Sequence, residues 1–482
     1  MSTTTAAPSS GMAGKLGTWL MIIATVGLAF VICVELINIL FYDPWSDDKF
    51  LFKLSGSLSG VEIGPLTYLM FGSLAVALMM GLPLAFVTGG LGVMFIYLVG
   101  DAMMLNIVPG RIFPLMANPD IAAIPLFIFM ASMLERAGLI EEMFSVVYKW
   151  MGGISGGLAA ATIVASTILA AMVGVIGAAV VTMGIIALPA MLKRHYDHKI
   201  AIGSIMAGGT LGILIPPSIL AILYAVVAQQ SVGELYLGSL LPGLMLSGLY
   251  LTYVLVRSWL NPKLGPPIPV EDRISLKEKL KLLGNLIAPL ALVGLVLGLL
   301  FGGIATPVEA AGIGSFGAII VAMMHKKFSI AGLREASVTT AKASAMVLWI
   351  MFGASVFVGF YILQVVLGMF LDWVGILLLA VPIFIPIVKA LEFPGLFGFP
   401  PVAGDDVVLW FGVLYLVNMQ MSFLSPPFGY ALFYIRGVCP PEISMGTIFK
   451  SSLVFLAIQA FGLFMCVLIP GIVTWLPGLV YG

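Results

Sequence analysis

Charged residues are scarce in this chain of 482 residues. Asp, Glu, Lys and Arg make up 9% of it, against about 25% in soluble domains. Apolar types reach 61%, and the mean hydropathy is +1.15. This composition excludes a soluble enzyme and a disordered protein, and it is typical of a chain dissolved in lipid. The charges cancel, 22 against 22, so no basic surface for nucleic acid is expected.

Cysteine and histidine are also rare, with three of each. The cysteines lie far apart or among apolar residues without metal-ligand spacing, and the histidines fall in basic polar segments. We therefore expect no transition metal, no haem and no other cofactor. A proton-pumping respiratory subunit would need several ionisable groups in mid-membrane, and a membrane enzyme would need a nucleophile–base pair, and neither pattern is visible. The residues concerned are Cys33, Cys439, Cys466, His195, His198 and His325.

The first apolar run, residues 16–42, is longer than a signal-peptide core and lacks a small-residue cleavage site. It predicts a first transmembrane helix, with Lys15 keeping the N-terminus in the cytoplasm. Three further segments rich in Lys and Arg, at 193–199, 257–281 and 326–334, are predicted to be cytoplasmic. Two apolar passes separate each successive pair, at 201–228 and 236–256, then at 285–303 and 308–324. This parity indicates an all-α polytopic membrane protein.

The polar segment in the middle divides the chain into two similar halves. Residues 209–218, GTLGILIPPS, align with residues 419–428, MQMSFLSPPF, at an offset of 210, and a two-residue gap then aligns Glu234 with Glu442. Parity runs the two copies in opposite directions, which predicts an inverted repeat. We therefore expect four segments: an N-terminal part at 1–64, a first transport half at 65–256, a cytoplasmic linker at 257–284 and a second half at 285–482.

Each half carries a Pro-Pro pair inside an apolar run. A proline removes an N–H and frees the carbonyl four residues earlier, so the pairs predict free carbonyls at Gly212, Ile213, Ser422 and Phe423. Bare carbonyls at membrane depth are tolerated only inside protein or against a cavity, and they are good ligands for a dehydrated alkali cation. A plain proline kink is the alternative for a single break, whereas two breaks in corresponding positions favour a binding site.

Upstream of each break lies an apolar stretch bounded by Gly and Pro, at 158–191 and 365–392. Parity favours a re-entrant helical hairpin for each, with its tip facing a Pro-Pro break; one ordinary span each is the alternative. Other signals are structural. Thr306 to Glu309 and Ser231 to Glu234 predict helix caps, Asn118-Pro-Asp120 predicts a helix start, and the G-x-G-x-x-G at 312–317 predicts close helix packing rather than nucleotide binding.

With these motifs the chain resembles the large membrane subunit of TRAP (tripartite ATP-independent periplasmic) transporters, the DctM family. The resemblance is carried by residues 81–86, 209–224, 305–318, 368–387 and 421–442 and covers about 65–480. It implies a bacterial inner-membrane secondary transporter that imports a small organic anion, mostly a carboxylate, by elevator-like alternating access. It also implies Na⁺ as coupling ion, a small four-helix membrane subunit and a periplasmic solute-binding protein. A stand-alone ion-coupled anion carrier is the alternative.

The resemblance and the repeat also assign candidate sites. Family cation sites carried onto this sequence place the first at the hairpin tip and first break, although Val173-Gly174-Val175 stands where many relatives have Ser-Gly-Ser. The repeat places the second site at the second break, with residues 368–372 opposite. The cation candidates are Val173, Val175, Gly212, Ile215, Pro217, Ser422, Ser425 and Pro427.

A carboxylate substrate favours a nearby cation or helix N-terminus. Residues 343–384 contain no Lys or Arg, and Lys342 and Arg436 are the nearest; a snorkelling role is the alternative for both. Asp372 lies between apolar runs and is either a helix cap or a group near the ion or substrate. The substrate candidates are Ser218, Gly177, Asp372 and Arg436.

Overall fold

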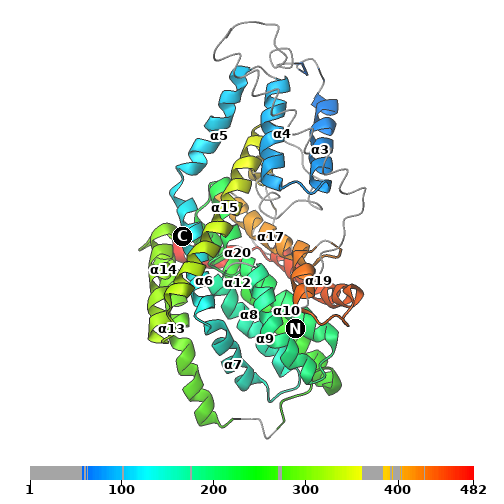
Figure 1. Cartoon of the computed structure of the whole chain (residues 1–482), viewed down its shortest axis with the longest axis vertical. Helices are drawn as coiled ribbons and strands as arrows, with labels where there is room; N and C mark the ends of the chain where they lie inside the picture. The colour runs from blue at the N-terminus through cyan, green and yellow to red at the C-terminus, as the bar shows by residue number, and fades with distance from the viewer. Residues whose placement is uncertain are drawn as a thin grey trace, which may run out of the picture.

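The computed structural model is built from helices (Figure 1). It describes residues 57–58, 61, 63–99, 102–173, 176–269, 274–360, 381, 384–390, 393, 402, 404–427 and 429–481. Within these ranges the only β-contact is an isolated antiparallel bridge between Phe393 and Val402. The predicted all-α fold is confirmed. The predicted first helix at 16–42 lies outside the described residues.

The first half contains α-helices and short 3₁₀ helices (η). They are α3 (Ile63–Met79), α4 (Leu84–Val99), η1 (Ala102–Asn106), α5 (Ile107–Met116), η2 (Pro119–Ala122), α6 (Ala123–Arg136), α7 (Leu139–Met151), α8 (Gly157–Val173), α9 (Ile176–Lys193), α10 (His198–Thr210), η3 (Leu211–Ile213), α11 (Ile219–Ala228) and α12 (Val232–Leu260).

A short 3₁₀ helix, η4 (Pro262–Leu264), lies in the linker between the halves. The elements that follow it are α13 (Leu276–Phe301), α14 (Pro307–Met324), α15 (Ile330–Phe360), α17 (Asp405–Leu424), α18 (Tyr430–Val438), α19 (Met445–Leu468) and α20 (Gly471–Tyr481). Helices α12, α13 and α14 occupy the positions of three predicted passes. Because α13 already begins at Leu276, the non-helical part of the predicted linker is shorter than 257–284.

Both Pro-Pro pairs interrupt a helix, as predicted. The first helix, α10, ends at Thr210 and passes through η3, and α11 begins only after Ser218. The second, α17, ends at Leu424, and α18 begins at Tyr430. The bonds Pro216–Pro217 and Pro426–Pro427 are both cis. With the offset of 210, the end of α11 at Ala228 corresponds to the end of α18 at Val438.

The repeat does not extend as far as the sequence alignment suggests. Glu234 lies in the first turn of α12, whereas Glu442 precedes Ser444, the N-cap of α19. Helices α12 and α19 therefore begin in different registers, and the predicted pairing of Glu234 with Glu442 is wrong.

Helices α8 and α9 form the first predicted hairpin. Its open end is closed by a hydrogen bond from the backbone N–H of Leu158, at the start of α8, to the hydroxyl of Tyr196, just beyond α9, at 3.2 Å. The polar linker reaches the same end, because the N–H of Asp197 donates to the carbonyl of Leu264 at 3.0 Å. The chain thus enters and leaves the hairpin on the side of the linker. Most of the second predicted hairpin, 365–392, lies outside the described residues.

Five helices in the described part are long and apolar enough to cross a membrane, and two bent helix pairs raise this to seven. One bent pair joins α5 to α6 at 63°, and at the bend the side chain of Asn118 accepts from the N–H of Asp120 at 2.9 Å, as the predicted helix start requires. The outer helices expose large apolar side chains, including Ile287 and Phe316 at 66% each. A soluble protein would bury such surfaces; in lipid they are stable.

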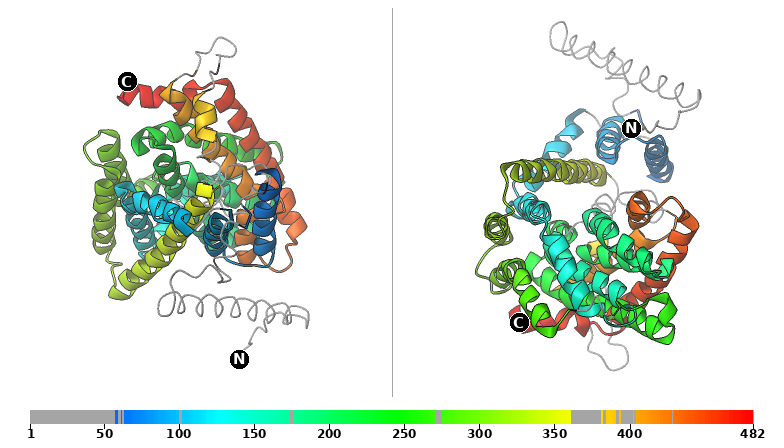
Figure 2. Two further views of the ribbon diagram at one scale, coloured as in Figure 1. Left: turned by 90° about the horizontal axis from the view of Figure 1, so that it is seen from above. Right: turned by 60° about the horizontal axis from the view of Figure 1, so that its bottom comes forward.

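Helix α10 lies at the centre of the molecule, and every residue from Ile200 to Thr210 is buried. It packs on α8, α9 and α19. Figure 2 shows the green helices of this region in the middle, with the yellow-green α13 and α14 along one edge. Close packing at the 312–317 motif is confirmed, because a Cβ placed on Gly317 would lie 2.3 Å from Leu292.

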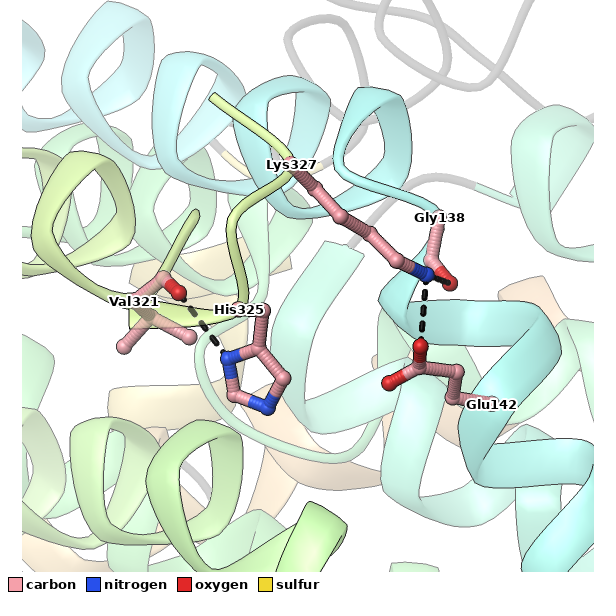
Figure 3. Close-up of polar contacts among 5 residues, drawn as sticks. All are labelled: Gly138, Glu142, Val321, His325 and Lys327. Carbon is pink, nitrogen blue, oxygen red and sulfur yellow. Dashed lines mark hydrogen bonds and ion pairs between the residues drawn. The ribbon is translucent and has the colours of Figure 1, made fainter. Parts of the chain in front are cut away.

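Polar contacts mark both ends of α14. The predicted capping box is present at α14, where Thr306 and Glu309 bond each other's backbone N–H groups at 3.3 and 2.8 Å. Lys327, just after α14, lies 2.6 Å from Glu142 on α7 (Figure 3). This ion pair attaches α7 to one of the predicted cytoplasmic loops.

Candidate functional site

The first Pro-Pro break is a buried stretch of irregular backbone. Gly212, Ile215 and Pro217 are all buried, and η3 packs against both α8 and α9. Irregular backbone enclosed by protein is the condition under which free carbonyls are tolerated at membrane depth. Of the two predicted ligands on the hairpin, Val173 is the last residue of α8, and Val175 lies outside the described residues.

Not all four predicted carbonyls are free. The carbonyl of Ile213 accepts a hydrogen bond from the hydroxyl of Ser218 at 2.6 Å, and that of Ser422 accepts from the N–H of Ser425 at 3.2 Å. The prediction of unpaired oxygens at these two positions is wrong, because a serine directly beside each Pro-Pro pair supplies a local donor: Ser218 follows the first pair and Ser425 precedes the second. The carbonyl of Gly212 differs: Pro216 offers no N–H, and no hydrogen bond to it is found within the described ranges.

The second break is more open than the first. Ser422 and Pro427 are exposed, and Ser425 is half-buried. The hydroxyl of Ser422 donates to the carbonyl of Met419 in its own helix at 2.7 Å. Residues 368–372, predicted to lie opposite, are outside the described residues, and so is the substrate candidate Asp372.

Ser218, a predicted substrate ligand, caps a helix. It is fully buried, donates to the carbonyl of Ile213, and its oxygen accepts from the N–H of Ala221 at 3.4 Å, at the start of α11. In this conformation its hydroxyl bonds both sides of the break.

Gly177 lies against α18, the helix that follows the second break. A Cβ placed on Gly177 would lie 3.0 Å from the Tyr434 ring on α18, and α9 packs along α18. The first hairpin therefore touches the helix that follows the second Pro-Pro pair, as well as the first break. The hairpin thus contacts elements of both halves.

The two cationic candidates differ in their surroundings. Arg436 on α18 is half-buried and donates to the carbonyl of Ile443, in the loop before α19. Lys342 is exposed on α15. Arg436 thus ties α18 to the following loop, and the structure brings neither cation to Gly212.

A cavity of about 630 Å³ lies between α4, α15 and α18. Its volume is within the usual range for small-molecule sites, about 300–1,000 Å³. Its walls carry the aromatic rings of Phe86, Trp349, Tyr430 and Tyr434, and none of its lining residues is charged. The first residue of α18, Tyr430, is part of this wall, so the N-terminus of that helix borders the cavity.

A buried polar cluster was missed by the sequence analysis. The Nε2 of Gln420 on α17 donates to Oγ1 of Thr210 on α10 at 3.2 Å, and Nε2 of Gln459 on α19 donates to the same oxygen at 3.3 Å. Gln420 also approaches the hydroxyl of Tyr250 at 3.5 Å. All four side chains are fully buried. A signal existed, because the offset of 210 that aligns the Pro-Pro pairs also aligns Thr210 with Gln420.

Metal ligands and reactive thiols do not form a site in the described part. No group of three or more His, Cys, Asp or Glu side chains gathers there. Cys466 is buried and Cys439 half-buried, and both are free. What the described residues offer is oxygen: backbone carbonyls, hydroxyls and amides.

Interrupted helices in corresponding positions of two halves, with a helical hairpin packed against them, define a secondary membrane transporter. Comparison with known sequences identifies the kind. The chain belongs to the DctM component family of tripartite ATP-independent periplasmic transporters, whose family model matches residues 71–366 and 360–472. It is a multi-pass inner-membrane protein of this family, whose members are transporters rather than enzymes and work with a small membrane subunit and a periplasmic binding protein.

Individual relatives are named for different substrates. The chain is 31% identical over 398 residues to the isethionate TRAP transporter permease protein DctMQ of Oleidesulfovibrio alaskensis, covering 79% of this chain and 62% of that longer protein. It is 26% identical over 454 residues to the C4-dicarboxylate TRAP transporter large permease protein DctM of Vibrio cholerae, covering 84% of this chain and 96% of that one.

One solved structure supports the fold. The YdaH transporter of Alcanivorax borkumensis, described as having an unusual topology, superposes with a TM-score of 0.54 at 15% identity. The match covers 83% of this chain and 97% of that one. At this identity the likeness concerns the fold alone.

Proposed function

We propose that this chain is the permease of a TRAP system that imports a small organic anion, driven by a Na⁺ gradient and elevator-like alternating access. The observation that carries the proposal is the first break. This segment is enclosed and packs against the hairpin, and its Gly212 carbonyl lacks a helical donor. A dehydrated Na⁺ binds carbonyl oxygens of this kind, and a buried carbonyl without a partner is otherwise unfavourable.

The cation sites are assigned to the two breaks. Val173, Val175, Gly212, Ile215 and Pro217 contribute to the first, through backbone oxygens. Ser422, Ser425 and Pro427 contribute to the second. The Ile213 and Ser422 carbonyls keep one lone pair after accepting their local bonds, so these bonds do not remove the Ser422 oxygen from the second site.

The substrate binds beside Gly177, in the cavity bordered by α18. The N-terminus of α18 supplies the positive end of a helix dipole for an anionic group, and Arg436 lies further along the same helix. The aromatic walls contact the remainder of the substrate. Carboxylates and sulfonates share this chemistry, in line with relatives named for C4-dicarboxylates and isethionate.

The partners of this chain are a small four-helix membrane subunit and a periplasmic solute-binding protein that delivers the anion. The N-terminus lies in the cytoplasm, on the side of the loops that hold Lys193, Lys263 and Lys327. A stand-alone ion-coupled anion carrier is the second candidate, and it needs neither partner.

Reconstitution into proteoliposomes tests the proposal. We expect uptake of a labelled C4-dicarboxylate or isethionate only when the chain, its small subunit and its binding protein are all present and the Na⁺ gradient points inward. Replacing Na⁺ by choline abolishes this uptake, whereas adding ATP does not change it. Uptake by the lone chain would favour the stand-alone carrier, and uptake by the full set without Na⁺ would contradict sodium coupling.

A further inference from the structure

Thr210 is the centre of a three-way hydrogen-bond junction. Its hydroxyl donates to the carbonyl of Ala207 in its own helix at 2.9 Å and accepts from the amides of Gln420 and Gln459. A hydroxyl has one proton and two lone pairs, so these three bonds use its whole capacity. Both amide oxygens, Oε1 of Gln420 and of Gln459, are buried, and no hydrogen bond to them is found in the described part. The bonds to Thr210 therefore hold the two side chains in place, and losing one would leave a further buried polar atom without a partner.

The bond between Thr210 and Gln420 joins the two halves at equivalent positions. Since 420 minus 210 equals the repeat offset, these residues correspond to each other. Thr210 stands two residues before Gly212, and Gln420 stands two residues before Ser422. Each therefore lies in or next to the last turn of a helix whose following backbone forms a predicted cation site.

We propose that Thr210 and Gln420 are positioning residues that couple the two cation sites, so that occupancy of one break orders the helix end at the other. The inference rests on the proposed function, because it requires two cation sites. A cation at the first break fixes the carbonyl of Gly212 and thereby the end of α10. The amide of Gln420 transmits that order to α17 and to the backbone after Ser422.

Gln459 provides a matched control within the same cluster. Like Gln420 it is fully buried, and its Nε2 donates to the same hydroxyl at nearly the same distance, 3.3 against 3.2 Å. It belongs to α19, however, and precedes neither break. Loss of its bond weakens the junction but leaves the connection between the two breaks intact.

The experiment measures Na⁺-dependent uptake in proteoliposomes that contain the full chain with its partners. For the unmodified protein we expect a Hill coefficient for Na⁺ near two. The Gln420→Met variant lowers it to near one and raises the half-saturating Na⁺ concentration about tenfold, within the usual range of coupling between sites. Gln459→Met keeps a Hill coefficient near that of the unmodified protein. Thr210→Ser retains the hydroxyl and the cooperativity, whereas Thr210→Val loses it.

A second measurement distinguishes a loss of coupling from poor folding of the variants. The Na⁺-induced rise in Tm of the purified complex is recorded for each variant beside Ser452→Ala, which removes a buried hydroxyl that donates to the carbonyl of Phe449 in its own helix. Equal loss of cooperativity in Gln420→Met and Gln459→Met would indicate a purely structural cluster and overturn the inference. So would unchanged cooperativity in Gln420→Met. If uptake by the unmodified protein does not depend on Na⁺, both the proposed sodium coupling and this inference are contradicted. This result is distinguishable because it appears in the unmodified protein, before any variant is compared.

Discussion

Gly209 on α10 lies directly against Val180 on α9: a Cβ on Gly209 would be 2.4 Å from Cγ2 of Val180. A separation this short is below any van der Waals contact, so only glycine permits α10 to approach the hairpin so closely. The contact lies one residue before Thr210 and three before Gly212. The distance between the hairpin and the first break therefore depends on the missing side chain at this position.

The Gly209→Ala variant should destabilise the protein despite the better helix propensity of alanine. Overpacking typically costs about 1–3 kcal/mol, which exceeds the gain of up to about 1 kcal/mol from replacing a helical glycine. We expect a lower Tm and weaker Na⁺-dependent uptake. Gly248→Ala is the control, because a Cβ on Gly248 meets nothing within 4 Å, and it should be neutral or stabilising. If Val180→Ala fails to rescue Gly209→Ala, the contact is not the cause.

Tyr196 provides a pH-dependent test of the hairpin base. Burial raises the pKa of its hydroxyl to about 12, from an ordinary 10.0, although the Leu158 N–H opposes this rise. The folded protein holds this proton more tightly than the unfolded chain does. Its contribution to stability is therefore fully present below about pH 10 and is lost as the pH rises through about 12.

The measurement for this prediction is Tm against pH for the unmodified protein and for Tyr196→Phe. The variant loses the hydrogen bond to Leu158, which lowers stability by about 1 kcal/mol at neutral pH. Its Tm should then fall less steeply between pH 10 and 12 than that of the unmodified protein. Parallel curves over this interval would contradict the assignment.

The ion pair of Lys327 and Glu142 should contribute little to stability. Their side chains are 37% and 31% exposed, and pairs at such surfaces contribute about 0–1 kcal/mol. We expect Lys327→Ala to lower Tm slightly at low salt and less at high salt. The charge-swapped double variant, Lys327→Glu with Glu142→Lys, should recover most of the loss.

The neighbouring Lys326 is the control for this pair. It belongs to the same loop, and no ion pair to it is found within the described residues. Its replacement by alanine should leave Tm unchanged. An equal effect of both substitutions would mean that total charge matters and the pair does not.

Local rules explain why much of the fold could be predicted from the sequence. The capping box at Thr306 and the breaks at both Pro-Pro pairs depend on residues within one helical turn. The pairing of the Ile213 carbonyl with Ser218 could not be predicted, because it depends on how the chain turns after the break. The Thr210–Gln420 bond joins residues 210 positions apart. The only sequence signal for this bond is that its separation equals the repeat offset. The pairing of Glu234 with Glu442 was wrong because the segment between α18 and α19, Cys439–Ser444, is longer than the one between α11 and α12, Gln229–Ser231, and a short match around one glutamate does not show where the extra residues lie.

Removing Pro216 tests the carbonyl that carries the proposed function. In Pro216→Ala the new N–H can donate to the carbonyl of Gly212. This N–H then competes with the cation for the carbonyl oxygen. We expect the half-saturating Na⁺ concentration to rise several-fold, on the order of the effect of one hydrogen bond of about 1 kcal/mol, while the Tm without Na⁺ stays equal or rises. Pro242→Ala is the matched control: Pro242 is also buried within a helix, but α12 continues through it unbroken. An equal Na⁺ response in both variants, or an unchanged response in Pro216→Ala, would show that the Gly212 carbonyl is not a cation ligand.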